Sequence, residues 1–166
     1  ISMKEGNNKE YRAEGGLGFI ASRLTIEGPI KKDTASFIIS GRRTFVDLFM
    51  REPFVKEDSR ANGNSYFFYD LNTKINYRLS DKDRLFISGY FGRDVFSFKS
   101  KETGFQARIS WGNATGSLRW NHLFSDQLFV NTSLIFSDYN FAFEADQKPF
   151  YFKLYSGVRD WNGKLD

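Results

Sequence analysis

The residue types that most often carry catalysis or bind metals are scarce in this sequence. His122 is the single histidine and there is no cysteine, which excludes a Cys/His nucleophile and a multi-histidine metal site within the chain. Asp81 and Asp83 stand close together but belong to a polar turn, where aspartates bond back to the local backbone. Asp126 and Asp138 are separated by a whole expected strand. We therefore expect no catalysed reaction, no metal and no cofactor, and we interpret His122 as a side chain at a membrane–water interface.

Arg42 and Arg43 are a second chemical candidate. Consecutive strand residues point to opposite faces, so only one of the two can point into the interior of a barrel. In one interpretation, that arginine meets an internal domain or an anionic solute. In the other, the pair marks a strand end at the level of lipid headgroups.

The stretch that positions such residues runs from Tyr66 to Phe98 and predicts two long strands joined by a turn at Ser80–Asp83. Apolar and hydrogen-bonding residues alternate strictly along its first half, which is the pattern of a strand with two unlike faces. Soluble strands are usually about five or six residues long, whereas tilted membrane-spanning strands need about nine to eleven. We therefore expect a transmembrane hairpin, although aromatics at both of its ends could instead fill the core of a soluble sandwich.

The same alternation selects the candidate site. On each strand, every second side chain can hydrogen-bond or carry charge. These side chains would form a ladder that faces the lumen of a barrel and is available to an internal domain or to a solute. These candidates are Arg42, Asp70, Asn72, Lys74, Asn76, Arg78, Arg119 and Asn121.

Composition excludes a helical membrane protein and is compatible with a membrane barrel. Aromatic residues make up 18% of the chain and the net charge is +4, with acids and bases intermixed rather than gathered in a block. No apolar run approaches the roughly 18 residues of a transmembrane helix. The chain starts at Ile1 without a signal peptide, and we expect both of its ends to continue in a longer protein.

In chain order we expect about seven strands with alternating short turns and long loops. Residues 1–10 would comprise a short strand-like piece, Ile1–Gly6, and a polar spacer. The expected strands cover 15–26, 35–48, the two halves of the central hairpin, 109–124, 128–143, and a last one from Phe150 toward Val158. Long loops are expected at Phe49–Ser65, at Ser100–Phe105 and from near Glu144. Seven strands would leave open edges, which lipid does not tolerate, so the sheet must belong to a larger closed barrel.

At this point the motifs resemble a known family. ISMKEG at Ile1–Gly6 resembles the last plug strand of TonB-dependent outer-membrane receptors. GPIKKDTASFIISGRRTF at Gly28–Phe45 is similar to the first barrel hairpin of such receptors from Bacteroidetes-type bacteria, and the hairpins that follow look alike too. The resemblance implies that residues 1–10 end a plug domain and that 11–166 begin a plugged transmembrane barrel of about 22 strands.

The expected function is therefore part of an active transporter in the bacterial outer membrane, taking up a metal chelate, vitamin, glycan or peptide. Its implied partners are outer-membrane lipid, its own plug, TonB through a region outside this chain, and possible lipoprotein or other envelope subunits. One alternative is a structural or accessory barrel of an outer-membrane assembly. Less favoured are a carbohydrate-binding β-sandwich, whose strands would be shorter, and a nucleic-acid-binding β domain, whose basic residues would gather on one face. No nucleic-acid partner is expected.

Overall fold

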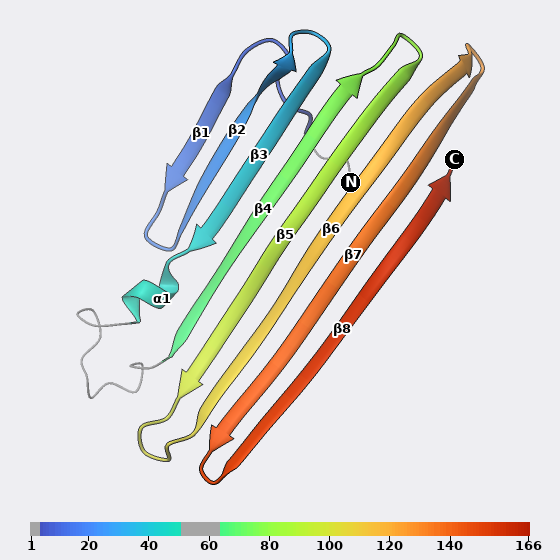
Figure 1. The fold of residues 1–166 in the computed structure, drawn as a ribbon. Helices are drawn as coiled ribbons and strands as arrows, with labels where there is room; N and C mark the ends of the chain where they lie inside the picture. The colour runs from blue at the N-terminus through green and yellow to red at the C-terminus, as the bar shows by residue number, and fades with distance from the viewer. Residues whose placement is uncertain (1–3, 51–63) are drawn as a thin grey trace.

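The computed structural model describes residues 4–50 and 64–166, and these form one antiparallel sheet of eight strands in chain order (Figure 1). Each strand pairs with the next one along the chain, so the all-β, up-and-down architecture expected from the alternation is confirmed. The strands are β1 (Arg12–Leu17), β2 (Ala21–Lys31), β3 (Ala35–Thr44), β4 (Ser65–Arg78), β5 (Asp83–Lys99), β6 (Gln106–Ser125), β7 (Leu128–Gln147) and β8 (Phe150–Leu165).

Two ends of the sheet differ in their connections. The β2–β3, β4–β5 and β6–β7 turns lie at the top of Figure 1, which we call the turn end. The opposite end of the sheet, which we call the loop end, carries the remaining connections. It also carries α1 (Val46–Phe49), a single helical turn between β3 and β4. Within the described residues no helix is long and apolar enough to cross a membrane.

The sequence predicts about seven strands, and the described residues form eight. The segment expected as a single strand over 15–26 is two strands, because the chain reverses at Gly18, whose backbone N–H donates to Ala21 O at 2.9 Å. The next expected strand also ends early: β3 stops at Thr44, and α1 occupies the residues after it. Most of the expected loop over 49–65 lies outside the described residues, whereas the loop at Ser100–Phe105 is confirmed between β5 and β6.

The third long loop, expected from Glu144, is absent. Strand β7 continues to Gln147 and only Lys148 and Pro149 join it to β8. Glu144 opposes Lys153 across the β7–β8 pair, and their side chains form an ion pair at 2.7 Å. The charged residues that suggested a loop are instead paired across two strands. Strand β8 also extends past Val158, the end expected from the sequence, to Leu165.

The strand register is staggered from hairpin to hairpin. Tyr77 and Trp120 stand in one row of directly opposed residues, through Leu85. Tyr77 is the next-to-last residue of β4, but Trp120 lies five positions before the end of β6 at Ser125. Each hairpin therefore reaches further past the row than the one before it, and such a stagger is the shear that sheet closure into a barrel requires.

Opposed residues share a side, so the rows divide the side chains between two faces. The Lys74 face contains Ile38, Lys74, Ser88 and the rows at even spacing from them; the Ile75 face contains Phe37, Ile75, Ile87 and the alternate rows. Near the middle of the sheet, apolar side chains are exposed on the Ile75 face while a charged side chain is sheltered on the Lys74 face. Lys74 is 7% exposed, while its neighbour Ile75 is 36% and Leu134 is 48% exposed.

There is almost no apolar core among the described residues, where the buried hydrophobic side chains are Ala35, Phe86 and Val95. The apolar side chains gather instead in a band on the Ile75 face, over its turn-end half. This apolar band consists of Phe37, Leu71, Ile75, Leu85, Ile87, Phe91, Ala114, Leu118, Trp120, Leu134 and Phe136.

Toward the loop end of β5–β8 the polarity of the two faces exchanges. The Ile75 face becomes charged and polar there, with Arg93, Arg108, Asp138, Asn140, Glu144, Lys153 and Arg159. The Lys74 face becomes apolar, and we call its residues the loop-end apolar patch: Tyr66, Phe68, Phe96, Ile109, Trp111, Phe141, Phe143 and Leu154. Neither strand length nor composition predicted this exchange.

Candidate functional site

All eight residues of the predicted ladder lie on the Lys74 face. Direct opposition places Arg42 beside Asp70, and the even positions from Asp70 to Arg78 follow one another along β4. Arg119 and Asn121 join the same face through Phe86 and Arg84, which oppose Asn76 and Arg78. The structure therefore brings these residues onto one surface, and their contact with a plug or solute stays a prediction.

The loop-side end of the ladder is an ion pair between adjacent strands. Arg42 donates from Nε at 2.8 Å and from Nη2 at 2.7 Å to Asp70 Oδ2. The Asp70 side chain is only 11% exposed, so this carboxylate is held by the guanidinium rather than by bulk water. Arg43 faces the other way and pairs with Asp47 in α1 at 3.2 Å, so the adjacent arginines divide between the faces as strand geometry requires.

Phe86 is the centre of the ladder, and sequence reasoning missed it. Its ring is 6% exposed and lies between two cations. The guanidinium carbon of Arg119 is 4.4 Å from the ring centroid, and Lys74 Nζ is 5.7 Å from it. Cations over an aromatic face are attracted by the ring quadrupole, so Phe86 fixes the positions of two ladder charges. Its even position within β5, opposite Asn76, was the available signal.

The segment before β1 lies against the same face. Asn76 Nδ2 donates to Glu5 Oε2 at 2.9 Å, and Lys4 Nζ pairs with Glu27 Oε1 at 2.9 Å. The backbone N–H of Asp33 donates to Asn8 O at 3.0 Å. Gly6 approaches β3 so closely that a Cβ at this position would stand 2.2 Å from Phe37 O. Residues 4–8 are thus held on the ladder by side-chain and backbone bonds.

Further hydrogen-bonding capacity remains on this face. The amide oxygens of Asn113, Asn121 and Asn131 are covered and have no hydrogen-bond partner within the part of the chain that the structure describes. All three stand in rows of the Lys74 face. They can accept hydrogen bonds from donors of another segment or of a solute.

The ladder and the loop-end apolar patch together make a surface with two chemistries. Its turn-end half offers charges and amides, and its loop-end half offers rings such as Trp111 and Phe141. The loop-end apolar patch was missed because the sequence prediction considered the alternation of the expected strand over 128–143 only in its first half. The signal was present in β7, where polar residues change from odd positions (Asn131, Ser133) to even ones (Asp138, Asn140).

Asp83 and His122, two of the residues considered for catalysis, contact each other and the residues around the β4–β5 turn. Ser80 Oγ donates to Asp83 Oδ2 at 2.7 Å and closes the turn, while Trp120 Nε1 donates to Asp83 Oδ1 at 3.0 Å. His122 Nδ1 lies 2.6 Å from the same Asp83 oxygen, and its ring packs on Phe124 at 4.4 Å. Among the described residues no group of three or more His, Cys, Asp or Glu could hold a metal ion.

Comparison with known proteins adds no identification. No family model, no curated protein and no solved structure matches this chain.

Proposed function

We propose that this chain is part of the wall of an outer-membrane β-barrel that imports a solute, of the TonB-dependent receptor class. The observation that carries the proposal is the arrangement of the two faces. An apolar band stands exposed on one side of the sheet, while charges such as Lys74 lie sheltered on the other. A soluble sheet would bury the band, but a lipid-facing strand has apolar residues outside and polar ones inside.

The size of the apolar band supports the same proposal. Arg93 follows Lys82 of the β4–β5 turn by 11 positions, and Asp138 follows Gln127 of the β6–β7 turn by 11 positions. Strands rise about 3.3 Å per residue, so at a tilt of about 40° these first charged residues stand about 28 Å above the turns. That height is close to the apolar band of about 25 Å in membrane barrels.

The residues 4–8 support an occupied interior. Their ion pair and hydrogen bonds with Glu27 and Asn76 are what the end of an internal plug would make with the barrel wall. The ladder would then hold the plug, and the loop-end apolar patch would line the outer part of the lumen. A transporter function follows from the resemblance to plugged receptors, in which the barrel admits solute past the plug.

The first test is the mass and location of the intact native protein. The proposal expects a polypeptide several times heavier than 19.3 kDa, found in outer-membrane fractions and migrating faster in SDS gels before boiling than after it. A soluble native protein of about 19.3 kDa would refute it. Cross-linking of the intact protein to TonB separates a transporter from an accessory barrel, since only the transporter requires that contact.

A further inference from the structure

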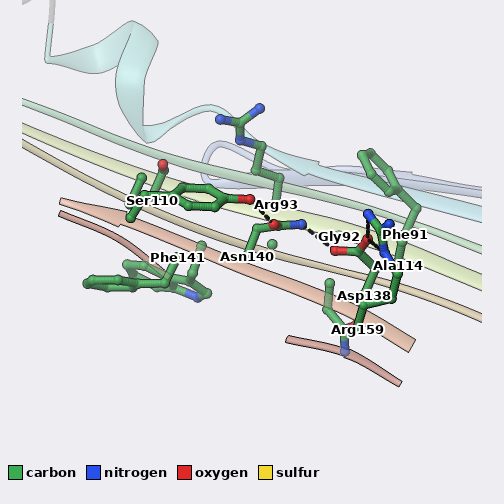
Figure 2. A pocket seen from close by; sticks show the side chains of 14 residues that line it. Phe91, Gly92, Arg93, Ser110, Ala114, Asp138, Asn140, Phe141 and Arg159 are labelled. Atoms are coloured by element: carbon green, nitrogen blue, oxygen red, sulfur yellow. Dashed lines mark hydrogen bonds and ion pairs between the residues drawn. The ribbon is translucent and has the colours of Figure 1, made fainter. Parts of the chain in front are cut away.

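The first polar residues above the apolar band surround a cavity on the Ile75 face (Figure 2). Its volume is about 440 Å³, and it lies over β6 between β5 and β8. The floor is made of small residues, Ser110, Gly112 and Ala114, because larger side chains stand only on the flanking strands. At Gly112 an added Cβ would come within 3.0 Å of Gly92 O, so the depth of the cavity depends on glycine there.

One wall of the cavity is a continuous chain of hydrogen bonds across β7 and β8. Arg159 Nε donates to Asp138 Oδ2 at 2.8 Å, and Asn140 Nδ2 donates to Asp138 Oδ1 at 2.6 Å. Tyr155 Oη donates to Asn140 Oδ1. The charge of Asp138 is thereby neutralised, and its neighbours are held in fixed positions, as the dashed lines of Figure 2 show.

The opposite wall carries a cation that this network does not use. Arg93 on β5 is exposed, and its side chain makes no hydrogen bond or ion pair with any residue that the structure describes. In Figure 2 it extends on the side of the sheet opposite to Phe141. The sum of Arg93, Arg159 and Asp138 leaves one positive charge at the cavity, without an anion to match it.

We propose that this cavity binds the phosphorylated headgroup of an outer-leaflet lipid, an inference that rests on the membrane-barrel function proposed above. Arg93 supplies the charge-assisted hydrogen bonds that a phosphate prefers, and Asn140 and Tyr155 border it on the other wall. The height of Arg93 and Asp138 above the turns puts the cavity at the headgroup level, which distinguishes it from a site for a free anion.

The surface directly below the cavity fits the acyl part of such a lipid. Along β6 the Ile75 face continues from Ala114 to Gly116, where an added Cβ would meet nothing within 4 Å. The next strands flank this shallow track with Phe91 on one side and with Phe136 on the other, whose ring packs on Trp161 at 4.7 Å. The charged cavity and the apolar track below it match the phosphorylated headgroup and the acyl chains of a single lipid.

The test uses the intact protein purified from outer membranes in detergent, with diphosphoryl lipid A as the probe and native mass spectrometry as the readout. Arg93→Gln should weaken lipid A binding by about tenfold or more, the usual scale for a hydrogen bond to a charged group. Ala114→Trp fills the floor without changing charge and should weaken it likewise. Arg84→Gln, an arginine on the Lys74 face near the turn end, is the matched control and should bind as the wild type does.

Inorganic phosphate separates the lipid from a free anion. We expect millimolar phosphate to leave lipid A bound, whereas complete displacement would overturn the lipid assignment. Equal lipid A affinity in Arg93→Gln and wild type would overturn this inference alone, provided that both proteins fractionate with the outer membrane. Absence of the wild-type protein from that fraction would refute the proposed function and this inference with it.

Discussion

Replacing Ile75 by arginine tests the orientation of the whole sheet. Ile75 stands in the middle of the apolar band, between Phe37 and Ile87 in its row. Its neighbour on the other face, Lys74, is already a cation and is 7% exposed. Ile75→Arg therefore puts a positive charge on the Ile75 face, whereas the neighbouring residue already holds a positive charge on the Lys74 face.

The magnitude follows from the depth of Ile75 in the proposed membrane. Ile75 precedes Asp81 of the turn by six positions, which corresponds to about 15 Å along the membrane normal at about 3.3 Å per residue and a tilt of about 40°. This depth is near the middle of the bilayer, where arginine on the lipid face costs about 2–4 kcal/mol. Leu134→Arg, in the same row, should behave similarly.

The assay compares matched variants in the intact protein, reconstituted in phospholipid vesicles and unfolded with urea. Asn72→Arg places the same side chain on the Lys74 face of the same strand and should cost far less than Ile75→Arg. These 166 residues contain no cysteine, so Ile75→Cys adds a labelling site with no competing thiol in this part of the protein, and a water-soluble maleimide should not reach it in the folded state.

Equal penalties for Ile75→Arg and Asn72→Arg would contradict the reasoning. That result would mean that both faces of the sheet are buried against protein, as in a sandwich. Rapid labelling of Ile75→Cys by the maleimide would mean that the Ile75 face is in water, and the lipid-facing assignment would then be wrong.

Three further perturbations address the Lys74 face. A double-mutant cycle with Arg42→Ala and Asp70→Ala should give a coupling of about 0.2–1 kcal/mol in urea unfolding, because the arginine is 51% exposed and water screens the pair. A zero coupling would mean that the ion pair does not stabilise the fold. Phe86→Leu should destabilise the protein by about 1–2 kcal/mol beyond the effect of Leu85→Ile, since it removes the ring under Arg119 and Lys74, and an effect as small as the control's would contradict the cation–π assignment. Gly6→Ala should release residues 4–8, because its Cβ would meet Phe37 O at 2.2 Å, and it should abolish disulfide formation between Glu5→Cys and Asn76→Cys. Gly16→Ala is the control, since its Cβ meets nothing within 4 Å, and it should leave the disulfide intact. A disulfide that survives in Gly6→Ala would show that the segment is not packed there.

The sequence by itself determined the local structure of this protein. The alternation over 67–79 depends only on neighbouring residues in the sequence, so it predicted a strand with two unlike faces and the common face of the ladder. The polar residues Ser80–Asp83 predicted the turn that follows. Charged residues near Glu144 misled the same reasoning, because a charge in a ladder and a charge in a loop look alike until the opposing Lys153 is known. The turn at Gly18 was missed for a similar reason, since glycines fit a strand or a reversal equally well.

The tertiary structure decided everything that depends on opposed strands. Only the register shows that Phe86 lies between Arg119 and Lys74, that residues 4–8 cover the ladder, and that the faces exchange polarity toward the loop end. Arg93 and Asp138 are 45 positions apart in sequence, yet stand at the same distance from their turns and border one cavity. Pairing between strands is non-local, so its stagger brings together residues whose relation no window of the sequence contains.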